Sequence, residues 1–303
     1  MRHVPAALAG PGGDGGRTRA AFLFRRVPRP RAPAPRHVSR DPRASDGRTD
    51  EAQLRCDIVE VGRRLYARGL IGGHEGNVSV RLDASLLITP AGVCKGFLTP
   101  EMIVRTDLEG RPLDGGRAST ETLMHTAVYR RRADVHAVVH AHPPTATGFA
   151  VAGIALDRPL IAEAVVTLGP VPVIPYGQPS TEELADRVGR AVCEAQALLM
   201  ANHGALAVGA TLEQAWERME TLEQLARVTL VARILGRDHL LPGAEVGRLE
   251  ESRARSGYPP PVCDPEPPPG PRPAAGKPSG GAVTLSETEL VKLITEAVER
   301  FRS

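Results

Sequence analysis

The sequence predicts an α/β domain in which helices cover a β-sheet. Between residues 50 and 237, stretches with apolar residues at helical spacing alternate with short runs typical of strands. The chain has 303 residues, and 42% of them are hydrophobic, which is enough to bury a sizeable core. This length is compatible with one large domain that carries tails, or with two small domains.

The elements follow from local patterns. A first helix is predicted over 50–68, where apolar side chains recur on one face and Gly69 follows as a stop signal. The same spacing predicts helices over 119–132, 181–194 and 211–235. Short apolar or alternating runs bounded by turn residues predict strands over 77–82, 85–89, 102–107, 135–142, 171–174, 197–200 and 205–208. Binding residues are then expected at strand ends and in loops.

The two ends of the chain depart from this pattern. Residues 1–49 are rich in Arg, Pro and Gly, and we expect them to be disordered because they bury too little apolar surface. An organelle transit peptide and a mis-assigned start codon are alternatives for this segment, although so many Pro and Gly residues suit an amphipathic helix badly. The folded domain is expected over 50–240, followed by a Pro/Gly-rich linker over 241–283.

A last amphipathic helix is predicted over residues 284–303. It opens with a capping box from Ser286 to Glu289, and its apolar stripe consists of Leu290, Leu293, Ile294, Ala297, Val298 and Phe301. A lone helix of this length is marginal in water, so the stripe requires a partner surface. The segment resembles the encapsulation peptides that carry enzymes into bacterial microcompartments, which implies a shell protein as partner; packing on the protein's own oligomer is the alternative.

Composition excludes several classes of protein. The net charge is only +3 and aromatic residues make up 3% of the chain, which argues against a nucleic-acid partner. No stretch is long and apolar enough to span a membrane, so we expect a cytoplasmic protein without a membrane partner, inside a microcompartment if the C-terminal segment binds a shell. The four cysteines, Cys56, Cys94, Cys193 and Cys263, have no paired spacing and are expected as reduced thiols.

Three histidines carry the strongest functional signal. His140 and His142 end an apolar run, and His203 stands at a second strand end. Because residues i and i+2 of a strand point to the same side, the first two imidazoles are expected within a few ångströms of each other. A third imidazole completes a site that leaves one position open, as in catalytic zinc sites. A His-x-His pair alone is more often structural, so the surrounding residues must decide.

A second set of residues is suited to binding an anion. Two glycines allow backbone N–H groups to approach closely, and three side chains add donors, two of them at a helix start where the dipole favours negative charge. These residues are Gly76, Asn77, Gly92, Ser119 and Thr120. Each also has an ordinary explanation as a turn residue or a helix cap, and Glu121 as an acid in a first helical turn. No single residue therefore decides the function.

Taken in order, these motifs resemble the class II aldolase/adducin family, and most closely its L-fuculose-1-phosphate aldolases. The likeness covers residues 50–237, and its motifs are Gly76-Asn77, Thr89-Pro-x-Gly92, Ser119-x-Glu121, His140-x-His142 and Asn202-His203-Gly204. The resemblance implies a three-layer α/β/α fold with a central, largely antiparallel sheet. It also implies a homotetramer with active sites at subunit contacts.

The resemblance assigns roles to the candidate residues. His140, His142 and His203 would bind Zn²⁺, Glu121 would be the acid/base, and the five anion-binding residues would hold the phosphate of a sugar phosphate. The implied reaction is cleavage of a ketose 1-phosphate, such as L-fuculose 1-phosphate, to dihydroxyacetone phosphate and an aldehyde such as lactaldehyde. Zinc would stabilise the developing enediolate while Glu121 moves the proton.

Several positions depart from the family pattern or have more than one interpretation. Ala91 stands where the aldolase has a hydroxyl, and Glu163 stands at the place of its catalytic tyrosine, so Glu163 or a neighbouring subunit's tyrosine (Tyr129, Tyr258) is a candidate proton donor. The residues expected to have only packing, turn or surface roles are His74, Lys95, His125 and His136. The alternative functions are a sugar-phosphate 4-epimerase or dehydratase of the same family, or a non-catalytic adducin-like interaction protein. The epimerases carry Asp at the position of Glu121.

Overall fold

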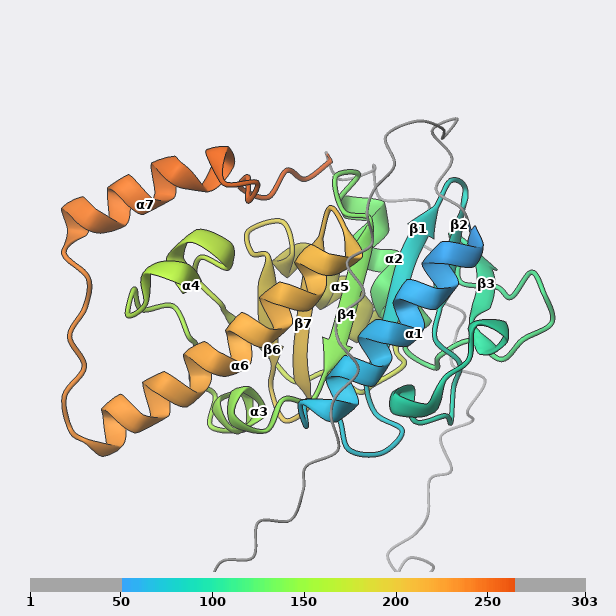
Figure 1. The fold of residues 1–303 in the computed structure, drawn as a ribbon, viewed down its shortest axis with the longest axis horizontal. Helices are drawn as coiled ribbons and strands as arrows, with labels where there is room; N and C mark the ends of the chain where they lie inside the picture. Colours follow the sequence, from blue (N-terminus) through green and yellow to red (C-terminus); the bar gives the residue numbers. More distant parts are fainter. Residues whose placement is uncertain (1–50, 265–303) are drawn as a thin grey trace, which may run out of the picture. The chain divides into compact units, whose positions relative to one another are not determined.

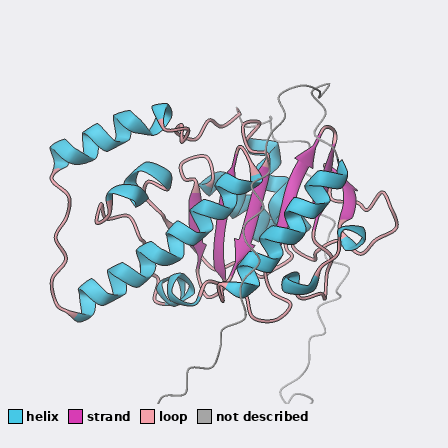
Figure 2. Ribbon diagram, viewed as in Figure 1, coloured by secondary structure: helices cyan, strands magenta, loops and turns pink. Residues whose placement is uncertain are grey.

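The computed structural model of the chain describes residues 51–264 (Figures 1 and 2). The segments expected as a disordered tail (1–49) and as an encapsulation-type helix (284–303) lie outside this range. Among the described residues, no helix is long and apolar enough to cross a membrane.

Residues 51–264 form one seven-stranded sheet in the order β3-β2-β1-β4-β7-β6-β5. Its strands are β1 (Asn77–Leu82), β2 (Ser85–Ile88), β3 (Val104–Asp107), β4 (Ala137–Ala141), β5 (Val173–Ile174), β6 (Ala197–Met200) and β7 (Gly204–Gly209). All neighbouring strands are antiparallel except β5 and β6, which are parallel. The predicted α/β fold with a largely antiparallel sheet is therefore confirmed.

Helices cover both faces of the sheet (Figure 1). They are α1 (Glu51–Ala67), α2 (Thr122–Arg131), α3 (Pro144–Val151), α4 (Ala162–Thr167), α5 (Glu182–Ala191), α6 (Leu212–Ile234) and α7 (Gly243–Arg255), with 3₁₀ turns at Lys95–Phe97 and Pro100–Met102. Helices α1, α3 and α6 pack on one face, and α2 and α5 pack on the other. Strand alternation creates both cores: Val139 faces the first layer and Val138 the second.

Strand register brings the predicted site residues to one edge of the sheet. In the β1–β4 pair Asn77 lies opposite His140, and in the β4–β7 pair Ala141 lies opposite Ala205. The end of β4 is therefore flanked by the starts of β1 and β7. Because the strands are antiparallel, residues that are far apart in the sequence meet at this edge.

Three helices were not predicted from the sequence. Helices α3 and α4 are short, and α3 is apolar around its circumference, so neither shows a clear period. Helix α7 occupies part of the interval 241–283 that was expected as a linker, so that expectation does not hold for residues 243–255. Its sequence is dominated by charged residues and Gly, and its contact with α4 comes from tertiary packing.

The expectation of four reduced cysteines was wrong. Cys193, at the end of α5, and Cys263, beyond α7, form a disulfide whose Cα atoms lie 5.2 Å apart, whereas Cys56 and Cys94 are free. The partners are separated by 70 residues, so no local motif could indicate the pair. Nearby hydrogen bonds also hold this segment: the Gln196 side chain donates to the Pro259 carbonyl (2.9 Å).

Removing this disulfide is expected to destabilise the domain without altering the sheet edge that carries the histidines. Cys193→Ser should lower the free energy of unfolding by about 2–4 kcal/mol, because the open chain regains the entropy of a long loop. Denaturant unfolding of wild type, Cys193→Ser and the control Cys56→Ser measures the effect. Equal stability of wild type with and without a reducing agent would contradict the cross-link.

Candidate metal centre and active site

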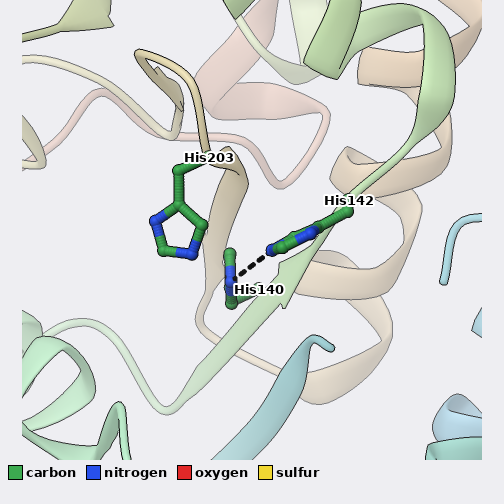
Figure 3. A group of neighbouring side chains, drawn as sticks. All are labelled: His140, His142 and His203. Carbon is green, nitrogen blue, oxygen red and sulfur yellow. Dashed lines mark hydrogen bonds between the residues drawn. The ribbon is translucent and has the colours of Figure 1, made fainter. Parts of the chain in front are cut away.

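The three predicted histidines converge at the sheet edge (Figure 3). His140 belongs to β4, His142 follows it directly, and His203 stands in the turn between β6 and β7. One ring nitrogen from each lies within 4.8 Å of the other two, and the Nε2 atoms of His140 and His142 are 3.2 Å apart. The turn presents His203 because Asn202 adopts a left-handed conformation (φ 56°), which Asn tolerates better than most residues.

Backbone contacts orient the three candidate ligands. His140 Nδ1 lies 2.8 Å from the Ala205 carbonyl oxygen, which can only accept, so Nδ1 carries a hydrogen and Nε2 is the ring nitrogen that faces the other histidines. The backbone N–H of His142 donates to Leu70 (3.1 Å), and that of His203 donates to Met200 (3.1 Å). A ligand ring whose other nitrogen donates to a carbonyl is the usual arrangement around a bound metal.

Glu121 completes the cluster from the N-terminus of α2. Its Oε2 lies 3.3 Å from His140 Nε2 and its Oε1 lies 3.1 Å from His203 Nε2. Oε1 is buried, and within residues 51–264 it has no partner with hydrogen-bond geometry. The 3.2 Å between the Nε2 atoms of His140 and His142 is close to the separation of about 3.3 Å that two ligands of four-coordinate Zn²⁺ with bonds near 2.0–2.1 Å require. Three imidazoles therefore fit three positions around a divalent transition metal, and the Glu121 carboxylate lies beside the open fourth position.

The protonation states also suit a metal centre. Burial, together with the neighbouring His140 and His203, lowers the pKa of His142 to about 4. Burial raises the pKa of Glu121, but His140 and His203 outweigh it, and the net pKa lies well below its usual range. At neutral pH the imidazole is neutral and the carboxylate ionised, which are the forms that bind a cation.

The five predicted anion-binding residues lie around the same sheet edge. Gly76 has a φ of 74°, and a Cβ there would lie 2.9 Å from the His140 carbonyl oxygen, so only glycine fits. Asn77 begins β1 beside it. The backbone N–H of Ser119 donates to the Thr89 carbonyl (3.2 Å), which brings residues 119–121 next to the loop that contains Gly92.

Exposure differs among these residues, and the helix starts later than predicted. Asn77 and Ser119 are buried, whereas Gly92 and Thr120 are exposed. Helix α2 begins at Thr122 with Glu121 as its N-cap, so Ser119 and Thr120 stand in the turn before it. The Ser119 hydroxyl accepts from the Glu121 N–H (3.3 Å), which shapes this turn.

Other predictions around the site need correction. Lys95, expected as a solvated lysine, is 2% exposed, and its ammonium donates to the carbonyls of His74 (2.6 Å) and Val93 (2.9 Å). It therefore holds together the loops that carry Gly76 and Gly92. Tyr129, a candidate proton donor to a neighbouring subunit, is buried and faces Ser79.

Three further residues were difficult to place from the sequence. Glu163 is exposed on α4, and the Tyr258 hydroxyl donates to Glu217 (2.9 Å). His125, expected to have only a packing or surface role, is fully buried and lies within hydrogen-bond reach of Asn77. His125 follows Glu121 by four residues, a spacing that places two side chains on one face of a helix. This spacing was the signal in the sequence that could have indicated a place for His125 near the site.

Comparison with known proteins agrees with this geometry. Residues 56–230 match the family described as Class II Aldolase and Adducin N-terminal domain. The chain belongs to this family. It is 33% identical over 192 residues to a 3-oxo-tetronate 4-phosphate decarboxylase of Escherichia coli O6:H1, covering 62% of this chain and 91% of the relative.

Aldolases are among the similar proteins as well. Identity is 38% over 173 residues to a 5-methylthioribulose-1-phosphate/5-deoxyribulose-1-phosphate aldolase of Escherichia coli O45:K1, covering 57% of this chain and 81% of the relative. The crystal structure of an L-fuculose-1-phosphate aldolase from Thermus thermophilus superposes with a TM-score of 0.57 and 39% identity, covering 63% of this chain and 100% of that one.

Close packing behind His142 provides a test of the histidine cluster. A Cβ at Gly204 would lie 2.6 Å from His142 Cδ2 and 2.7 Å from the Ala141 carbonyl oxygen. Gly204→Ala is therefore expected to displace the His142 ring and weaken metal binding about tenfold or more. Metal titration against Gly148→Ala, where a Cβ meets nothing within 4 Å, is the comparison. Unchanged affinity in Gly204→Ala would show that His142 does not hold the metal.

Proposed function

We propose that the protein is a zinc-dependent class II aldolase that cleaves a ketose 1-phosphate of the L-fuculose 1-phosphate type to dihydroxyacetone phosphate and an aldehyde such as lactaldehyde. The observation that carries the proposal is the convergence of His140, His142 and His203, two of which, His140 and His203, lie against the Glu121 carboxylate. Zinc fits this donor set because imidazole nitrogens with one open position form catalytic zinc sites.

The roles of the residues follow from the chemistry. Cleavage leaves negative charge on an enediolate of dihydroxyacetone phosphate, and zinc, when bound, supplies Lewis-acid stabilisation of that charge. Glu121 then moves the proton to or from the substrate carbon, for which a buried carboxylate held at the site is suited. Gly76, Asn77, Gly92, Ser119 and Thr120 would hold the phosphate through N–H and O–H donors.

A second candidate reaction is decarboxylation of a 3-oxo sugar acid phosphate. It is favoured by the 33% identity to the 3-oxo-tetronate 4-phosphate decarboxylase of Escherichia coli O6:H1. Loss of CO₂ from such an acid leaves an enediolate of dihydroxyacetone phosphate, the same species that retro-aldol cleavage leaves. The metal ligands and Glu121 would therefore serve both reactions, and the residues around the leaving group would determine which substrate is accepted.

An epimerase and an interaction protein fit the site less well. A 4-epimerase of the family would carry Asp where this chain has Glu121. A non-catalytic adducin-like protein would have no need for three convergent histidines beside a buried carboxylate. A dehydratase is one of the outcomes that the assay below distinguishes.

The assay offers the zinc-loaded protein a panel of phosphates. It contains L-fuculose 1-phosphate, 5-deoxyribulose 1-phosphate, 5-methylthioribulose 1-phosphate, 3-oxo-tetronate 4-phosphate and a pentulose 5-phosphate. Dihydroxyacetone phosphate is measured with a coupled dehydrogenase, and CO₂ is measured in parallel. Dihydroxyacetone phosphate without CO₂ supports the aldolase, whereas release of both identifies the decarboxylase. Faster interconversion of pentulose 5-phosphate epimers, or loss of water from a substrate, would refute both.

We also propose that the protein works as a homotetramer. The resemblance to class II aldolases motivates this, and exposed apolar side chains on the second half of α6, among them Val231 (55% exposed) and Ile234 (74% exposed), provide contact surface. Sedimentation equilibrium should give four chains per particle. A monomer at micromolar concentration would contradict the proposal.

We propose, finally, that residues 284–303 bind a microcompartment shell protein. The support is the sequence pattern: a capping box, an apolar stripe and a preceding Pro/Gly-rich stretch. The segment fused to a fluorescent protein and co-expressed with shell proteins should form foci, whereas Leu293→Glu should stay diffuse. Diffuse fluorescence for both fusions, or loss of catalysis on deleting the segment, would reject the idea.

A further inference from the structure

Four buried polar side chains lie between strand β1 and helix α2. Asn77 and Ser79 come from β1 and are 2% and 0% exposed, and His125 and Tyr129 come from α2 and are 0% and 4% exposed. Tyr129 belongs to the second core, together with apolar residues such as Val138. Burying polar groups at such a place costs free energy unless each one is hydrogen-bonded.

The four side chains form a continuous chain of hydrogen bonds that ends on Glu121. Tyr129 Oη lies 2.8 Å from Ser79 Oγ, and Ser79 Oγ lies 2.6 Å from His125 Nδ1. The other ring nitrogen, His125 Nε2, contacts Asn77 Oδ1. The Asn77 amide nitrogen then donates to Glu121 Oε2 over 2.8 Å. The metal-proximal carboxylate is thus connected to a tyrosine on the third turn of the same helix.

The donor and acceptor of every hydrogen bond in this series follow from the Glu121 carboxylate at one end. A carboxylate can only accept, so the NH₂ group of Asn77 must face Glu121 and its carbonyl oxygen must face His125. His125 must then donate from Nε2 and accept at Nδ1. The Ser79 hydroxyl consequently donates to His125, and its oxygen accepts from the Tyr129 hydroxyl. One orientation of each group satisfies all of them at once.

We propose that His125, Ser79 and Tyr129 are positioning residues that hold the Asn77 amide in the orientation that donates to Glu121. The opposite orientation would place an amide oxygen against the carboxylate and repel it. The chain thereby fixes the rotamer of the acid/base, and it leaves the second amide hydrogen of Asn77 for the substrate phosphate. The inference rests on the proposed role of Glu121.

The first test is spectroscopic and needs no substrate. In the full-length, zinc-loaded protein with ¹⁵N-labelled histidine, NMR reports which ring nitrogen of each histidine carries hydrogen. We expect His125, identified by the signal that disappears in His125→Gln, to be the neutral Nε2–H tautomer at pH 7. Burial, together with His140, supports the neutral form, since they lower the pKa of His125 to about 3. An Nδ1–H tautomer would reverse the Asn77 amide and overturn the proposal.

The second test is kinetic and uses matched variants. His125→Leu removes the donor to Asn77 and so weakens the hydrogen bond from Asn77 to the charged Glu121. Because a hydrogen bond to a charged partner is at stake, kcat should fall about tenfold to a hundredfold, while the zinc content stays unchanged. His125→Gln keeps a donor near Nε2 and should restore most of the activity. His136→Leu, at an exposed histidine, is the control. Wild-type kcat in His125→Leu, or equal impairment in His125→Gln, would overturn the positioning role.

Ser79→Ala keeps the proposal testable if His125→Leu fails to fold. Loss of the hydroxyl that donates to Nδ1 should leave His125 as the Nε2–H tautomer, because Asn77 still accepts from Nε2, but it should loosen the ring and lower kcat; an unchanged kcat would count against the positioning role. A wild-type protein that turns over none of the sugar phosphates would contradict the proposed function alone, because the tautomer is measured without substrate.

Discussion

His142→Ala is expected to abolish stoichiometric metal binding and to lower turnover by at least about a hundredfold. Loss of a direct metal ligand should cost more than loss of a residue that only hydrogen-bonds a ligand. The fold should persist, because the side chain is half-buried at a strand end and the backbone N–H of residue 142 keeps its bond to Leu70 (3.1 Å). Elemental analysis after dialysis measures the metal, and thermal unfolding measures the fold.

The matched control for this experiment is His136→Ala. His136 is exposed and stands just before β4, so its loss should change neither metal content nor turnover. Full zinc occupancy and turnover in His142→Ala would show that the site of His140, His142 and His203 is not the functional metal centre.

Glu121→Gln is expected to lower kcat by roughly a hundredfold or more, the usual worth of a general base, while the zinc content is retained. The amide has nearly the same size as the carboxylate, and its oxygen can still accept from the Asn77 amide, which lies 2.8 Å from Oε2. The amide cannot, however, take up a proton. Single-turnover kinetics on the accepted sugar phosphate would place the loss in the chemical step.

Glu182→Gln serves as the control for charge removal, because Glu182 is exposed in the first turn of α5. If Glu121→Gln lost its metal as well, the carboxylate would be a structural ligand. If it kept full turnover, proton transfer would have to involve another group, and exposed Glu163 would be the next residue to replace.

Much of the secondary structure could be predicted from local patterns. The helix predicted over 211–235 is observed as Leu212–Ile234, and the strand predicted over 77–82 is observed as Asn77–Leu82. Apolar periodicity predicts these elements because the face that enters the core repeats along the chain. Short or highly charged helices, such as α4 and α7, lack that repeat, and packing against neighbouring elements positions them.

In the candidate site, too, local spacing predicted some features and tertiary packing decided the others. The i, i+2 spacing of His140 and His142 predicted two rings on one side of a strand, and the structure places their Nε2 atoms 3.2 Å apart. The meeting with His203 and Glu121 depends on the pairing of β4 with β7 and on the packing of α2. The family resemblance implied that meeting, whereas local spacing could not, and the phosphate-binding and metal-binding roles stay predictions.

By itself, then, the sequence determined the residue types and local periods: three histidines of a candidate metal site, a series of helices and strands, and an acid at the start of α2. Only the tertiary structure decided which side chains are partners over long separations, such as Cys193 with Cys263, or His125 with Asn77 across 48 residues. The physical reason is that periodicity is a property of neighbouring residues. Hydrogen-bond direction, burial and disulfide geometry instead depend on how sheet and helices pack.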